Sequence, residues 1–259
     1  MHAYYKPYTV RVGALSDCTT DVLGHIEDAH APVEVKRGGT ELCTAGTQIR
    51  RPFAVVSGWL LRTRLLLDGR RQVLGFYLPG DTVHLDLHED PVAPCTVECL
   101  TDVTLADIEP LRRHIMNARF SDPVSAAVRS TLAMDEVIAL ANISRLARQS
   151  AYERVALLLL ELHHRLSTVR LSSADGFHLP VTQQVLSDAL GLSVVHVNRT
   201  LMQLKRDGLV DRQQRNLTLP DLEALAALVD FTRPSIGNGA ARKASGDVSR
   251  RTARVSCGV

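Results

Sequence analysis

The sequence has few aromatic residues and no long hydrophobic run. Aromatic side chains make up 4% of the 259 residues, and no segment approaches the roughly 18 consecutive apolar residues that a membrane-spanning helix needs. The first residues, Met1-His2-Ala3-Tyr4-Tyr5-Lys6, lack the apolar core of a signal peptide. We therefore expect a cytoplasmic protein that does not associate with a membrane.

Cysteine is scarce and scattered. An odd number of widely spaced cysteines is unlike the disulfide framework of a small secreted protein. We expect reduced thiols at Cys18, Cys43, Cys95, Cys99 and Cys257.

The chain also has little net charge, with 30 Lys and Arg against 28 Asp and Glu. The distribution is uneven: residues 1–139 hold 14 basic and 18 acidic residues, whereas residues 140–259 hold 16 and 10. Residues 233–259 are rich in Pro, Gly, Ser and Ala and have six basic residues and one acidic residue, which predicts a disordered basic tail. The basic half is the candidate for contact with nucleic acid.

The most informative motif spans residues 182–206. Thr182 can cap a helix whose buried face carries Leu186, Ala189 and Leu190, and Gly191 ends it. A second helix, capped by Ser193, has a buried stripe at Val194, Val197, Leu201 and Leu204. This pattern predicts a helix-turn-helix, which places its second helix in the major groove of DNA.

Two short strand-like runs follow, at residues 209–212 and 217–219, around the polar turn Gln213-Gln214-Arg215-Asn216. Pro220-Asp221 then opens a last amphipathic helix. A winged helix-turn-helix is the predicted arrangement.

The first half has a different pattern. From Val33 to about Ile108, short apolar runs alternate with turn signals, of which Asp68-Gly69 is the best hairpin signal. We predict an antiparallel β-roll or barrel.

A long helix is predicted between the two halves. Pro123 is an allowed first-turn residue, with Ser121 or Asp122 as the cap, and the helix extends to about Ala147. Its apolar residues cover more than one face, so it can pack on the roll and on the same helix of a second subunit. The capping box Ser150-Ala151-Tyr152-Glu153 starts another helix, which makes Gln149-Ser150 a candidate hinge.

This order of elements resembles the Crp/Fnr superfamily of bacterial transcription factors, over about residues 30–232. The residues that carry the resemblance are Val56-Ser57-Gly58-Trp59, Asp68-Gly69-Arg70-Arg71-Gln72, Pro79-Gly80-Asp81 and the run from Leu190 to Arg199. The resemblance implies an α+β fold and a homodimer that binds a palindromic operator on double-stranded DNA and recruits or blocks RNA polymerase, without enzymatic activity. The expected regions are a 1–29 extension, a 30–120 roll, a 121–148 dimerisation helix, a 149–232 winged helix-turn-helix and a 233–259 tail.

This chain departs from the family at the residues that bind the effector in other members. Cyclic-nucleotide binders resemble Gly-Glu-Leu after the Pro-Gly-Asp turn and later Arg-Ser/Thr-Ala, whereas this chain has Gly80-Asp81-Thr82-Val83-His84 and Val92-Ala93-Pro94-Cys95-Thr96. Without the phosphate-binding arginine we predict weak or no cyclic-AMP binding. The iron-sulfur members have a close N-terminal cysteine cluster, and here only Cys18 lies near the N-terminus. The expected effector is a small molecule that the sequence does not identify.

The resemblance also assigns DNA contacts. Arg199 fits bidentate recognition of guanine, Asn198 fits adenine or a phosphate, and Val195 can only pack on a thymine methyl where the family has Glu. The candidates for positioning on the DNA backbone are Gln183, Gln184, Ser193 and His196.

Two alternative functions would place the functional site in the β-roll rather than in the helix-turn-helix. Histidine after a Pro-Gly-Asp turn superficially resembles a cupin-like metal enzyme, and a haem, metal or redox sensor could use His84, His88 and Cys95. Surface histidines and buried cysteines explain the same residues more simply. We therefore predict no metal site and no cofactor.

Overall fold

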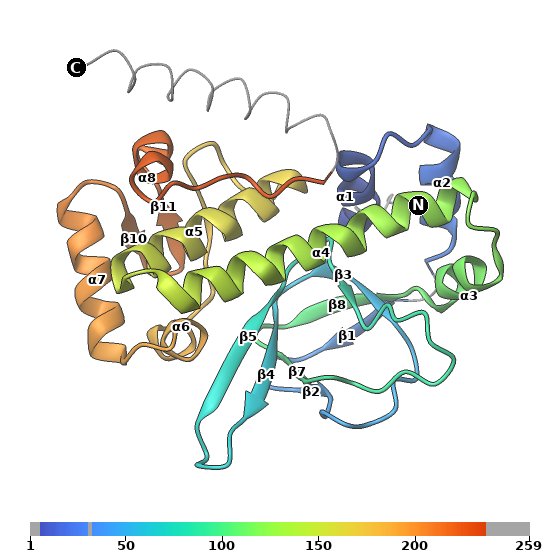
Figure 1. Ribbon diagram of the computed structural model, residues 1–259, viewed down its shortest axis with the longest axis horizontal. Helices are drawn as coiled ribbons and strands as arrows, with labels where there is room; N and C mark the ends of the chain where they lie inside the picture. Colours follow the sequence, from blue (N-terminus) through green and yellow to red (C-terminus); the bar gives the residue numbers. More distant parts are fainter. Residues whose placement is uncertain (1–5, 31–32, 237–259) are drawn as a thin grey trace, which may run out of the picture.

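A computed structural model describes residues 6–30 and 33–236 of the chain. Figure 1 shows a β-rich half below a long helix and a mainly helical half beside it. No helix within the described residues is long and apolar enough to cross a membrane.

Two four-stranded antiparallel sheets make up the β-rich half, in the orders β1-β8-β3-β6 and β2-β7-β4-β5. The side chains between them form an apolar core that includes Val55, Leu60 and Val97. The predicted antiparallel β half is therefore confirmed. The strands are β1 (Val33–Lys36), β2 (Glu41–Cys43), β3 (Phe53–Ser57), β4 (Leu60–Leu65), β5 (Arg71–Tyr77), β6 (Thr82–Val83), β7 (Thr96–Cys99) and β8 (Val103–Asp107).

The hairpin predicted at Asp68-Gly69 joins β4 to β5, which pair from Leu60 with Tyr77 to Leu65 with Arg71. Gly69 has a φ of +81°, a left-handed conformation that glycine adopts without a steric penalty. The turn therefore forms where the sequence indicated it.

The long helix is α4 (Pro123–Arg148), and Asp122 caps it by accepting from the Ser125 backbone N–H at 2.7 Å. Ser150 and Glu153 form the predicted capping box of the next helix, α5 (Ala151–Thr168). Figure 1 shows α4 crossing the molecule between the roll and α5. The starts of both helices follow from their N-terminal capping residues.

The N-terminal region contains two helices that the sequence analysis did not predict, α1 (Pro7–Leu15) and α2 (Thr20–Asp28). Their buried side chains, including Tyr8, Val12 and Ile26, share a core with α4 and with α3 (Glu109–Asn117), which was also missed. Helices this short have little stability of their own, so packing on α4 stabilises them.

The helical half adds α6 (Gln183–Leu190), α7 (Val194–Arg206), α8 (Leu222–Leu228) and a small sheet in the order β10-β11-β9. The two predicted wing strands are β10 (Asp211–Gln213) and β11 (Asn216–Thr218), while β9 (Gly176–His178) was not predicted. A three-residue strand beside Asp175-Gly176 is too short to show a period-two pattern. Most of the predicted disordered tail, residues 237–259 with Cys257, lies outside the described residues.

One apolar core joins the two halves. Trp59, Leu61 and Phe76 of the β4–β5 hairpin belong to the same buried cluster as Leu159 of α5 and Leu186 of α6. The roll is therefore packed directly on the helical half.

Candidate nucleic-acid interface

The pair α6 and α7 is built by local capping contacts. Thr182 accepts from the Val185 N–H at 3.2 Å, and Ser193 accepts from the His196 N–H at 3.2 Å. Between the helices Gly191 has a left-handed φ of +62°, and the Ser187 hydroxyl donates to the Leu192 carbonyl at 2.5 Å. These contacts form the sharp turn that a helix-turn-helix requires.

The inner face of α7 is buried, and its outer face is exposed to solvent. Val197, Thr200 and Leu204 are buried, whereas Val195 and Met202 are 71% and 55% exposed. Exposed apolar side chains on the same helix face as exposed cations are suited to a partner that has both methyl groups and acceptors on its surface, as the major groove does. The face consists of Val195, Asn198, Arg199, Met202 and Arg206.

Arg199 and Arg206 form neither a hydrogen bond nor an ion pair within the described part of the chain, so both guanidinium groups are free to contact a ligand. The Gln183 side chain donates to the Asn198 side-chain oxygen at 3.4 Å, which links the start of α6 to the exposed face of α7. The structure thus brings four of the predicted DNA contacts to one surface: Asn198, Arg199, Gln183 and Val195.

The other predicted backbone-positioning residues lie at the rim of this surface. Gln184 is exposed and donates to Asp188 at 2.8 Å, Ser193 is engaged as the cap of α7, and His196 is exposed on its first turn. Their role in DNA contact stays a prediction.

The roll makes a direct polar contact with this helix pair. Arg71 of β5 donates from Nε and Nη2 to one carboxylate oxygen of Asp188, at 3.0 and 2.9 Å, and Gln72 donates to the Asp188 carbonyl at 2.8 Å. Glu98 of β7 also accepts from Arg71 at 3.4 Å. The β4–β5 hairpin is therefore tied to the first helix of the helix-turn-helix.

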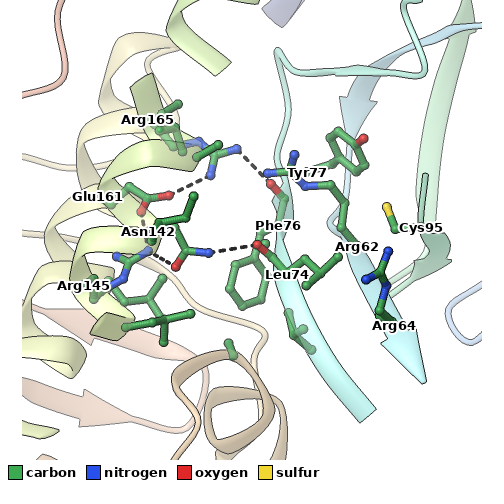
Figure 2. A pocket seen from close by; sticks show the side chains of 18 of the residues that line it. Arg62, Arg64, Leu74, Phe76, Tyr77, Cys95, Asn142, Arg145, Glu161 and Arg165 are labelled. Atoms are coloured by element: carbon green, nitrogen blue, oxygen red, sulfur yellow. Dashed lines mark hydrogen bonds and ion pairs between the residues drawn. The ribbon is translucent and has the colours of Figure 1, made fainter. Parts of the chain in front are cut away.

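A cavity of about 490 Å³ lies between the β4–β5 hairpin and helices α4 and α5. Figure 2 shows Arg62 and Arg64 on its strand side, and Arg145, Glu161 and Arg165 on its helix side. Glu161 accepts from Arg145 at 2.8 Å and from Arg165 at 3.0 Å. The cavity wall therefore contains four cations and one carboxylate.

Several of these arginine donors lack an acceptor. The Nε atoms of Arg62, Arg145 and Arg165 are buried and have no hydrogen-bond partner among the residues that the structure describes. Arg62 lies over the Tyr77 ring, with 4.9 Å from its guanidinium carbon to the ring centroid, and Arg64 forms neither a hydrogen bond nor an ion pair with another described residue. Unsatisfied buried donors with excess positive charge favour an anionic occupant.

The helix side of the cavity continues into a buried chain of ion pairs. Arg165 pairs with Asp81 in the Pro-Gly-Asp turn, and Arg11 of α1 bridges Asp81 at 3.1 Å and Asp135 of α4 at 2.5 Å. Burial acts against the charged forms, yet the neighbouring carboxylates raise the pKa values of Arg11 and Arg165 above the usual range. One network thus connects the N-terminal helix, the roll, α4 and α5.

The residues considered for a metal or haem sensor are not assembled. His88 is exposed and contacts Asp86, with 2.6 Å from its Nδ1 to the carboxylate, Cys95 is buried in the roll, and His84 contacts Cys43 instead. The described residues contain no group of three metal-capable side chains. The sequence could not indicate the Cys43 and His84 contact, because 41 positions separate them.

Two family models match the chain. Residues 33–111 match the cyclic nucleotide-binding domain, and residues 153–228 match the Crp-like helix-turn-helix domain. The matched regions are the roll and the helical half described above.

Regulatory proteins of several bacteria are similar to this chain. The nitrogen fixation regulation protein FixK of Azorhizobium caulinodans is 32% identical over 179 residues, which cover 68% of this chain and 70% of that protein. The transcriptional activator protein FnrA of Stutzerimonas stutzeri is 29% identical over 212 residues, covering 75% and 81%. The solved structure of FixK2 from Bradyrhizobium japonicum superposes with a TM-score of 0.65 at 26% identity, covering 81% of this chain and 99% of that one.

Proposed function

The chain belongs to the Crp/Fnr family of DNA-binding transcriptional regulators, which are not enzymes, and we propose that it binds a palindromic operator as a homodimer and responds to an anionic signal molecule. The bare outer face of α7, with two free guanidinium groups beside exposed apolar side chains, is the observation that carries the DNA part of this proposal.

Base reading is assigned to three side chains on that face. Arg199 donates to guanine O6 and N7, Asn198 contacts adenine or a phosphate, and Val195 packs on a thymine methyl. Gln183, Gln184, Ser193 and His196 position the protein on the backbone. The operator therefore differs from the usual family half-site at the base that Val195 meets.

Substitution of Arg199 tests this assignment. Arg199→Ala should weaken operator binding by about 1 to 3 kcal/mol and relax the preference at one base position in a gel-shift titration at fixed salt. Arg119→Ala removes the same charge from an exposed site beyond α3 and serves as the matched control. Equal affinity of the Arg199→Ala protein and the control would show that the register is wrong.

The homodimer is supported by an exposed stripe on α4. Small and aliphatic residues recur there at alternating spacings of four and three, the period of a coiled-coil seam, and small side chains allow two helices to approach closely. Leu140 is 58% exposed on this stripe, although it is a large apolar residue. The stripe consists of Ala126, Ser130, Ala133, Val137, Leu140, Ser144 and Ala147.

The signal is assigned to the cavity of Figure 2. Its excess of cations and its unsatisfied guanidinium donors call for a carboxylate or phosphate group, and Arg62 and Arg64 are the donors that no protein carboxylate engages. The stretch Val92-Ala93-Pro94-Cys95-Thr96, where cyclic-nucleotide binders resemble Arg-Ser/Thr-Ala, has no arginine to pair with a cyclic phosphate. Cyclic AMP is therefore expected to bind weakly or not at all.

A thermal-shift panel tests the cavity. Small carboxylates and phosphates should include compounds that raise the unfolding midpoint of the wild-type protein and fail to do so in Arg62→Met, which keeps an unbranched apolar stem and loses the guanidinium charge. Isothermal titration with cyclic AMP should show no micromolar affinity. A ligand that stabilises both proteins equally, or micromolar cyclic-AMP binding, would contradict the assignment.

The remaining partners follow from the family. We propose RNA polymerase as the protein partner and the cytoplasm as the compartment. We also propose that the protein holds no iron-sulfur cluster, because Cys18 is the only cysteine near the N-terminus, where the iron-sulfur members have a close cysteine cluster.

A further inference from the structure

A thiol and an imidazole meet in a second cavity of the roll. Cys43 is the last residue of β2, and His84 directly follows β6. The Cys43 Sγ lies 2.8 Å from the His84 Nε2. A nucleophile and a base within hydrogen-bond distance form the arrangement that activates thiols in proteins.

The cavity beside this pair has a volume of about 510 Å³ and shares no lining residue with the cavity of Figure 2. Its wall is polar: Thr44, Thr47 and Gln48 contribute side chains, and Arg50 forms no ion pair within the described residues. Cys43 and His84 are both half-buried, so a small water-soluble reagent can reach the sulfur.

The His84 imidazole can act as the base that removes the proton of the Cys43 thiol. Burial raises the pKa of the Cys43 thiol, and burial lowers the pKa of His84. Near neutral pH the pair is therefore a neutral thiol beside a neutral imidazole, whose unprotonated nitrogen can accept the S–H proton. A thiol with a raised pKa is unreactive unless such a base removes its proton during the attack.

We propose that Cys43 is an oxidative modification site, at which hydroperoxides convert the thiol to a sulfenic acid with His84 as the general base. As Sγ attacks one peroxide oxygen, an S–O bond forms, the O–O bond breaks and the thiol proton passes to Nε2. The leaving hydroxide, or the alkoxide where the oxidant is an organic hydroperoxide, takes that proton and departs as water or as an alcohol. The sulfur is oxidised by two electrons and the peroxide is reduced. This inference does not depend on DNA binding.

Other cysteines of the chain serve as internal controls for the oxidation rate of Cys43. Cys18 is half-buried like Cys43, but no histidine of the described residues forms a hydrogen bond with it, and Cys95 and Cys99 are buried. If exposure alone governed oxidation, Cys18 and Cys43 would react alike. If the base governs it, Cys43 reacts faster.

The test treats the full-length wild-type protein with hydrogen peroxide and a dimedone-type sulfenic acid trap, and follows each cysteine peptide by mass spectrometry. Cys43 should be labelled at least about 100-fold faster than Cys18, the lower end of the usual contribution of a general base. His84 has a φ of +58°, and Asn is among the residues that tolerate this conformation best. His84→Asn should therefore keep the fold and reduce Cys43 labelling to the rate of Cys18.

The ratio of the Cys43 and Cys18 labelling rates in the wild-type protein tests the proposal even if His84→Asn is destabilised. Equal labelling of Cys43 and Cys18 would overturn the proposal. Unchanged labelling in a folded His84→Asn protein, or one stoichiometric metal ion bound through both Cys43 and His84, would do the same.

Discussion

Among single residues, Asp81 joins the Pro-Gly-Asp turn to two buried arginine side chains. Its carboxylate accepts from the Leu78 N–H at 2.7 Å, which closes the Pro-Gly-Asp turn, and it pairs with Arg11 and Arg165. All three side chains are buried. A buried cation that loses its partner is strongly destabilising, because its desolvation is no longer offset.

Asp81→Asn should therefore lower the free energy of unfolding by about 3 to 5 kcal/mol, measured by urea denaturation. Asp68→Asn is the matched control, because Asp68 makes a solvent-exposed contact with Arg70 in the β4–β5 turn and should have little effect. Similar unfolding midpoints for the two variants would contradict the structural role of Asp81.

Some residues of the two candidate sites could be predicted from the sequence, and others could not. The exposed face of α7 was predictable, because a helix repeats at 3.6 residues and its buried and exposed positions can be counted along the chain. The cavity arginines were not: Arg62 and Arg165 lie 103 positions apart, and only the packing of α5 on the β4–β5 hairpin brings them together. The contact between Cys43 and His84 was missed for the same reason.

Among the helices, α4 is buried on one side and exposed to solvent on another. Met134 and Ile138 are buried, whereas Leu140 and Ile143 are 58% and 64% exposed. Single exposed apolar residues are ordinary on the surface of a monomer, but Leu140 lies on the coiled-coil stripe of α4, where it would contact the second subunit.

Leu140→Asp should convert the dimer to a monomer, because two carboxylates would meet at the seam. Light scattering after size exclusion would report the mass, and operator affinity should fall with it. Val35→Asp places the same charge at a 71% exposed valine of β1, away from α4, and should leave the mass unchanged. A Leu140→Asp dimer would show that α4 is not the interface.

The helices α4 and α7 were predictable because their caps and hydrophobic periods are local. By contrast, α1 and α2 are stabilised mainly by contacts with α4, including the Arg11 to Asp135 ion pair 124 positions apart. Elements that depend on distant partners leave a weak signal in the sequence.

In the whole molecule, three kinds of contact join the roll to the helical half that carries the helix-turn-helix. They are the shared apolar core, the buried ion network and the Arg71 to Asp188 contact. A ligand in the cavity of Figure 2 would touch the first two directly. We therefore expect ligand binding to change the position or mobility of α6 and α7.

The whole molecule should also lose stability on mild acidification. Burial lowers the pKa values of His30, His84 and His164 below the usual 6.5. Below that value the unfolded chain binds more protons than the folded one, so the free energy of unfolding falls as the pH falls. The thermal unfolding midpoint should be lower at pH 5.5 than at pH 7.5, and a midpoint that is equal or higher would contradict the buried neutral state of these histidines.

Reading of a palindrome by two copies of α7 can be tested by selection from a random double-stranded DNA library with the full-length protein. We expect an enriched two-fold symmetric site, with half-site centres about one helical turn, roughly 10 base pairs, apart and with an unusual base where Val195 packs. Enrichment of no sequence, or of a single asymmetric half-site, would contradict it.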